Sequence, residues 1–182
     1  VGKVFAQLGF DGLAVGLFDF GATPVAFQRF RQVMAKEGVP LLASNVSCTK
    51  GKSGAATRCE GLRHAQSREP YRVVTRGQLK VGIFSVLRGD LQRRILRHGD
   101  GELRAADPVA FSRTLIRKLR SKERVDLVIV LANLNLENTA PKPVLDYVRA
   151  LGKDAPELIV TNAMYERGSS SGYLRQIRRG ET

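Results

Sequence analysis

Short apolar runs that end abruptly in loops constrain the fold of this chain more than any other feature. Leu127–Leu131 and Leu158–Val160 are almost continuously apolar, which is typical of strands buried on both faces of a sheet. Segments with helical periodicity lie between such runs, and one of them begins with Asp107-Pro108, a pair suited to the N-cap and the first helical position. This alternation predicts an α/β layered fold.

The other elements follow from periodicity and turn residues. Arg76-Gly77-Gln78 separates two strand-like runs as a hairpin turn does, which makes the sheet mixed. Gly38 and Gly152 stand where helices would end. We expect helices over 1–9, Pro24–Gly38, Asp107–Lys122 and Pro141–Leu151, strands over Leu13–Phe18, Val39–Val46, Tyr71–Thr75 and Leu79–Leu87, an irregular stretch over Ser47–Glu69, and a loop with a short helix over 88–106. The first long helix should bury Val25, Phe27, Phe30, Val33 and Met34, and the second Val109, Phe111, Leu115, Ile116 and Leu119.

The length of 182 residues predicts one main domain, which we place at 1–168, followed by a basic C-terminal tail at 169–182. No apolar stretch approaches the ~20 residues that a spanning helix needs. The first residue is Val1 and no signal-peptide pattern follows it, so we expect a processed or trimmed chain whose targeting signal is gone.

Thirty basic residues against 17 acidic ones give a formal charge of +13. Such an excess favours polyanionic partners, namely nucleic acid, anionic membrane or an acidic protein surface. Much of it lies in three clusters, Arg113–Arg124, Arg88–Arg97 and Arg175–Arg179, which also fit solvated helix faces and loops. No aromatic-basic interleaving, zinc knuckle or helix-turn-helix pattern marks a dedicated reader of nucleic acid.

Two cysteines, Cys48 and Cys59, flank a loop rich in Gly, Ser and Lys. A disulfide between them would close a small loop and contribute roughly 2–3 kcal/mol in an oxidising compartment. Two free thiols are the alternative, and no neighbouring ligand makes the pair a metal site. The only histidines, His64 and His98, are expected on the surface.

Four blocks in order resemble the calcineurin-like metallophosphoesterases of the 5'-nucleotidase type. Leu8–Gly16 resembles the segment that leads into the family's Gly-Asn-His-Glu/Asp motif, and Pro40–Val46 resembles its Pro-Val-Leu-Ser-Ala-Asn strand. Tyr71–Phe84 resembles its hairpin, and Asp107–Leu131 resembles the helix and strand before its Ser-His-Leu-Gly motif. The resemblance covers roughly residues 1–165 and implies a layered metallophosphoesterase-like fold that lacks the family's opening motifs.

The resemblance also implies a two-metal site, since the family uses paired divalent cations to activate water. The positions that should hold those cations carry other residues here. The family's Asn and His fall on Leu17 and Phe18, the His of Ser-His-Leu-Gly falls on Asn133, and those of Gly-His-x-His fall on Ala163 and Tyr165. Asp19 alone keeps the family's residue type. We therefore expect no metal, no cofactor and no catalytic residue.

These observations support a non-catalytic domain that binds or scaffolds. Its degenerate cleft could still hold an anionic or sugar-like group through Asp19, Asn45, Asn133, Asn162 and Tyr165, although Asn45 also suits a strand-end tie. Two alternatives stay open: a metal-dependent phosphoester hydrolase completed by an N-terminal region, and a basic module that docks on polyanions. Absent first strands would leave a sheet edge for a protein partner or a second copy to cover. Family members are mostly exported, which favours a periplasmic or extracellular location and a Cys48–Cys59 bridge.

Overall fold

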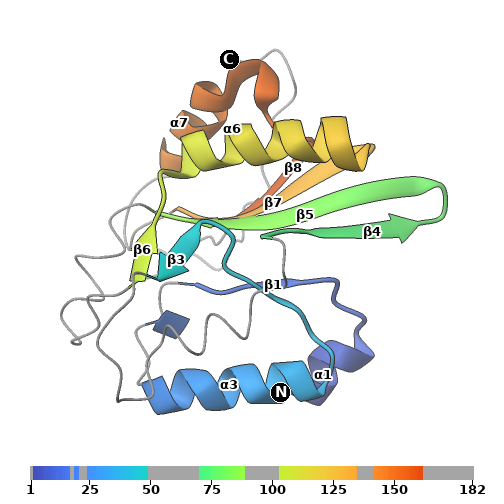
Figure 1. The fold of residues 1–182 in the computed structure, drawn as a ribbon, viewed down its shortest axis with the longest axis vertical. Helices are drawn as coiled ribbons and strands as arrows, with labels where there is room; N and C mark the ends of the chain where they lie inside the picture. Colours follow the sequence, from blue (N-terminus) through green and yellow to red (C-terminus); the bar gives the residue numbers. More distant parts are fainter. Residues whose placement is uncertain are drawn as a thin grey trace, which may run out of the picture.

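A computed structural model describes residues 2–16, 19–20, 24–48, 70–88, 103–134 and 142–161. Their elements stack in layers (Figure 1). Helices α6 (Pro108–Lys118) and α7 (Lys142–Leu151) cover one face of a four-stranded sheet, while α1 (Gly2–Gln7) and α3 (Pro24–Lys36) lie on the far side of the molecule. Short strand pairs fill the space between the sheet and α3. The predicted layered α/β fold is confirmed.

The main sheet has the order β4-β5-β7-β8 and is mixed, as predicted. Strands β4 (Arg72–Arg76) and β5 (Leu79–Leu87) form the expected antiparallel hairpin, and Gly77 takes the positive φ (+60°) of its tight turn. Strands β7 (Leu127–Asn133) and β8 (Leu158–Thr161) then add in parallel. In this register Leu87 pairs with Asn133 at the carboxyl end of the two central strands.

Two small strand pairs replace two longer predicted strands. Of the run expected over Leu13–Phe18, residues 13–16 are described, and they form a strand at β1 (Leu13–Ala14), which pairs in parallel with β2 (Leu41–Leu42). The strand predicted over Val39–Val46 was wrong as one unit. A turn at Ser44–Asn45 breaks it, and the chain continues as β3 (Val46–Cys48) in another sheet. Its antiparallel partner is β6 (Leu103–Ala105), a strand in the segment where we expected only loop and helix.

The helices begin and end where their capping residues predicted. Asp107 caps α6 by accepting a hydrogen bond from the Ala110 N–H at 2.8 Å, and Pro108 is the first helical residue. A π-helical turn, η2 (Leu119–Glu123), extends α6 and ends at Arg124 in the left-handed region. Gly38 and Gly152 have positive φ just after α3 and α7. After α7 the chain forms one short 3-10 turn, η3 (Gly152–Asp154).

The buried face of α3 differs in part from the prediction. Phe27 and Met34 are buried and Phe30 packs against them, as expected. Val25 and Val33 are 55% and 46% exposed, because they lie on the other side of the helix from the Phe27, Phe30 and Met34 stripe.

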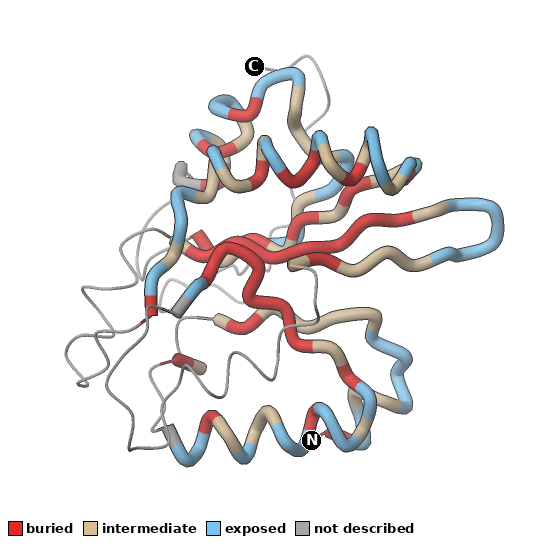
Figure 2. Tube along the Cα trace, viewed as in Figure 1, coloured by how far each residue is buried: buried red, intermediate tan, exposed pale blue. Residues whose placement is uncertain are grey.

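The core consists of two main clusters that meet the sheet from opposite sides. Burial along β7 alternates between buried and half-buried residues, and Leu158 and Val160 of β8 are 51% and 49% exposed. The prediction that both strands are buried on both faces was therefore wrong. The face that carries α6 and α7 packs on the larger cluster, whereas on the opposite face Leu42, Val81 and Ile83 form a small cluster against which residues of β7 are partly buried. Figure 2 shows the burial along these strands.

Candidate ligand site at the strand ends

Two polar side chains converge on Gly16, just beyond the end of β1. Asp19 Oδ2 accepts a hydrogen bond from the Gly16 N–H at 2.7 Å, which folds the chain back after the strand. A Cβ atom placed on Gly16 would lie 2.6 Å from Asn133 Nδ2 and 3.5 Å from Asp19 Oδ2. Glycine therefore leaves the room in which the Asp19 carboxylate and the Asn133 carboxamide come together.

The electrostatics of this pair are those of one carboxylate held partly away from water. Burial raises the pKa of the Asp19 carboxyl above its ordinary value, and the hydrogen bond from Gly16 opposes that rise. Within the described ranges, no group of three or more His, Cys, Asp or Glu side chains could hold a metal ion. The site therefore combines one acceptor that is costly to ionise with one neutral amide.

Asn45 is bound into the scaffold. Its Nδ2 donates to the carbonyl oxygens of Leu87 (2.8 Å) and Ala106 (2.9 Å), and its Oδ1 accepts from the Leu87 N–H at 2.9 Å. Next to it, Ser44 Oγ accepts from the Ser85 N–H, and Ser85 Oγ donates to the Leu42 carbonyl. These buried bonds tie the turn after β2 to the end of β5, so Asn45 acts as the strand-end tie that we considered for it.

Several predicted positions lie outside the described residues, and their place in the site stays a prediction. They are Leu17, Phe18, Asn162, Ala163 and Tyr165. The same holds for the Cys48–Cys59 bridge, for the two histidines and for the tail at 169–182.

The residues at this site do not fit a pair of catalytic divalent cations. Such cations need several carboxylate, imidazole or amide-oxygen donors around each ion. Asp19 and Asn133 supply one carboxylate and one amide, and the carboxylate already accepts from Gly16. Leucine, phenylalanine and alanine at positions 17, 18 and 163 have no side-chain donor atom for a metal. The two described donors, Asp19 and Asn133, are too few for two such cations.

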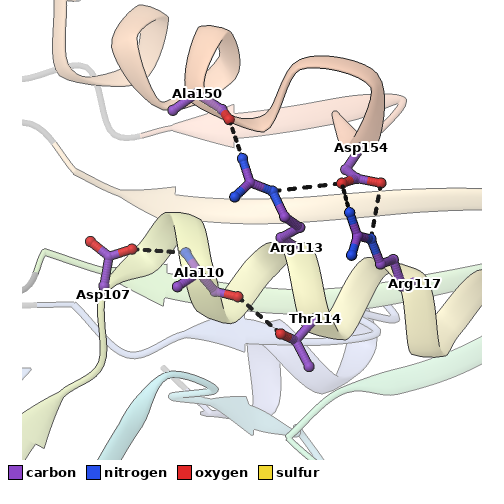
Figure 3. A network of polar contacts seen from close by, with 7 residues as sticks. All are labelled: Asp107, Ala110, Arg113, Thr114, Arg117, Ala150 and Asp154. Atoms are coloured by element: carbon purple, nitrogen blue, oxygen red, sulfur yellow. Dashed lines mark hydrogen bonds and ion pairs between the residues drawn. The ribbon is translucent and has the colours of Figure 1, made fainter.

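The basic run that starts at Arg113 has a structural use that the sequence reasoning missed. Arg117 makes a two-pronged contact with Asp154, at 2.8 and 3.3 Å, and Arg113 Nε lies 3.6 Å from the same carboxylate (Figure 3). Arg120 pairs with Glu157 at 2.6 Å. The signal was available: Arg113, Arg117 and Arg120 recur at helical spacing on one face, and two acids stand just before the next strand.

Comparison with known proteins places the fold. No family model and no curated protein matches the chain. A candidate 5'-nucleotidase of Staphylococcus aureus, solved in complex with alpha-ketoglutarate, matches with a TM-score of 0.58 and 12% identity over 88% of this chain and 30% of its own. The calcineurin-like phosphoesterase YfkN of Bacillus subtilis matches with a TM-score of 0.54 and 19% identity over 76% of this chain and 39% of its own. The chain thus spans about a third of the length of the solved proteins it matches.

Proposed function

We propose, from a metallophosphoesterase-type fold whose ligand positions carry other residues, that this chain is a non-catalytic, 5'-nucleotidase-like domain that binds or scaffolds. The single observation that supports this best is the donor set around Gly16. This set consists of the Asp19 carboxylate, which is costly to ionise, and the Asn133 amide. Two divalent cations would need more ligands than these two side chains supply.

The remaining groups suit a neutral, hydroxyl-bearing ligand better than a phosphate ester. Asp19 can accept from hydroxyl groups, and the Asn133 carboxamide can both donate and accept. A phosphate without neighbouring cations would be repelled by an ionised Asp19. We therefore expect a sugar-like group at this site, with Asn162 and Tyr165 as further contacts.

Metal-dependent turnover tests the proposal. The purified chain would be assayed with an aryl phosphate and with nucleoside monophosphates in the presence of Mn²⁺ or Zn²⁺, and its metal content measured by elemental analysis. We expect no turnover above a buffer control and no stoichiometric metal. Turnover that depends on bound metal would overturn the proposal and favour the alternative, a phosphoester hydrolase completed by further sequence.

Binding at the site is tested by isothermal titration with adenosine, adenosine monophosphate and alpha-ketoglutarate. Adenosine carries ribose hydroxyls and a neutral base, adenosine monophosphate adds a phosphate to these, and alpha-ketoglutarate carries two carboxylates and a keto group but no hydroxyl. We expect adenosine to bind more tightly than the two anions, and Asn133→Ala to weaken that binding about tenfold, the effect of losing roughly 1.4 kcal/mol. Tighter binding of both anions would contradict the assignment of ligand class.

A scaffolding role would use the exposed edge of the sheet. Strand β8 has one neighbour, β7, within the described residues, and two of its apolar side chains are about half exposed. An edge of this kind pairs readily with another chain. A protein partner or a second copy at β8 is thus part of the proposal, whereas docking on polyanions gains less support because Arg113, Arg117 and Arg120 contact internal oxygens.

A further inference from the structure

The segment that ends the described part of the chain has almost no hydrophobic anchor. Leu151, the last residue of α7, is 2% exposed. From Gly152 through Thr161, which covers η3 and β8, no residue is buried (Figure 2). Ile159 is half-buried against the α6 and α7 cluster, while Leu158 and Val160 are about half exposed on the other face. Apolar burial therefore contributes little to holding this edge of the sheet.

Most of the contacts that hold η3 and β8 in place are hydrogen bonds and ion pairs to arginines on one face of α6 and η2. Besides the contacts of Arg113 and Arg117 with Asp154, Arg113 donates a hydrogen bond to the Ala150 carbonyl at 2.5 Å (Figure 3). Arg120, in η2, donates to the Ala155 carbonyl at 2.9 Å and to Glu157 Oε1 at 2.6 Å. The other oxygen of Glu157 accepts from the Val128 N–H at 2.8 Å, at the start of β7.

We call these five side chains, Arg113, Arg117, Arg120, Asp154 and Glu157, the arginine latch. Three of its contacts are charge pairs near the surface, and such pairs are individually weak and are screened by salt. The backbone ladder between β7 and β8 spans only four residue pairs. A strand held by a short ladder, little apolar burial and screened ion pairs should have a low free energy of local opening.

We propose that η3 and β8 form a detachable edge of the sheet, which the arginine latch holds closed and which opens when its ion pairs are screened or removed. The other edge strand, β4, differs because its partner β5 is buried over most of its length and joins it through a tight turn. Opening would uncover the edge of β7.

Hydrogen exchange measured by mass spectrometry tests the latch itself, without any ligand. The full chain would be compared with the double variant Arg117→Gln/Arg120→Gln and with Lys122→Gln, which removes a nearby exposed charge that makes no ion pair within the described residues. We expect amides of residues 158–161 to exchange about five- to tenfold faster in the double variant, the range of two weak pairs. The rates in β4 and β5 should stay unchanged, and Lys122→Gln should behave as the parent.

A salt series on the parent chain keeps the test decisive if the double variant does not fold. Raising NaCl from about 0.05 M to about 1 M shortens the screening length to about 3 Å, so exchange in 158–161 should accelerate relative to β4. Equal salt response of β4 and β8, or an equal effect of Lys122→Gln and the double variant, would overturn the latch. Failure of ligand binding alone would count against the proposed function and leave the latch standing.

Discussion

At the scale of single residues, Asp19 is a carboxylate held partly away from water, and its ionised form does not stabilise the fold. Its carboxylate turns inward to cap the Gly16 N–H beside the Asn133 amide, and burial raises its pKa. A carboxyl whose pKa is raised in the folded state stabilises the fold when protonated, and this contribution is lost as pH rises through the folded pKa. At neutral pH the ionised group is therefore a cost.

Asp19→Asn should accordingly be neutral or stabilising near pH 7, by up to about 1 kcal/mol. The amide oxygen can still accept from Gly16, while the charge is removed. Urea unfolding of the parent and the variant at several pH values checks this, and the difference should vanish below about pH 4, where the free carboxyl is protonated too. A variant destabilised at pH 7 and matched at low pH would contradict the assignment.

Asn45, in contrast to Asp19, stabilises the scaffold. Its carboxamide makes three hydrogen bonds in a buried turn, so Asn45→Ala should cost about 2–4 kcal/mol by leaving Leu87 and Ala106 groups without partners. Ser47→Ala, which removes one long and exposed bond to Arg104, serves as the matched control and should lie within about 0.5 kcal/mol of the parent. Chemical denaturation measures both, and equal losses would refute the tie.

At the scale of elements, the helices were predicted more accurately than the strands. Caps are local signals, and Asp107, Gly38 and Gly152 each stand at a helix end as their residue types indicated. The strand over Val39–Val46 was misread because its Ser44-Asn45 turn is made by side-chain bonds to β5. Those partners lie 41 and 42 residues away, beyond any local pattern.

The latch gives the β8 edge a pH dependence whose sign follows from Asp154. Hydrogen bonding to Arg117 holds the pKa of the Asp154 carboxyl below its ordinary value, with smaller effects of the Arg117, Lys153 and Arg113 charges, and the same contact raises the pKa of Arg117. A depressed carboxyl pKa stabilises the docked state above the ordinary value of about 3.9, and this is lost as pH falls through the folded pKa.

We therefore expect β8 to open on acidification before the rest of the sheet. Amide exchange of 158–161, corrected for the intrinsic pH effect with β4 as the reference, should rise below about pH 4. Asp154→Asn should make β8 exchange faster at neutral pH and remove most of this acid response. If β8 opened together with β4 at every pH, Asp154 would not be the cause of acid-dependent opening at β8.

At the scale of the whole molecule, the sequence predicted the kind of fold and left open which surfaces are free. Four weak blocks in the right order sufficed for the layered fold, because order and spacing restrict topology more than any single motif does. The sequence could not predict how far β8 is buried, because an apolar strand at the edge of a sheet has the same composition as an apolar strand in its centre. Asp19 and Asn133 were singled out through the resemblance and not through any local signal.

Two whole-molecule properties act against each other at that free edge. The net charge of +13 keeps copies apart at low ionic strength, while Leu158 and Val160 offer an apolar edge for strand pairing. Salt screens the repulsion and weakens the latch at once, so self-association of the parent chain should increase with NaCl. Placing a lysine on an edge strand is a common means of blocking such pairing.

Val160→Lys should therefore suppress the salt-dependent association, and Leu79→Lys should not. Leu79 is equally exposed at 49%, but it lies next to the hairpin turn in β5, which has a neighbouring strand on both sides. Both variants add the same charge, so a general electrostatic effect would lower association equally in the two. Sedimentation velocity across a salt series distinguishes these results, and association that persists in Val160→Lys would assign the contact to a surface other than β8.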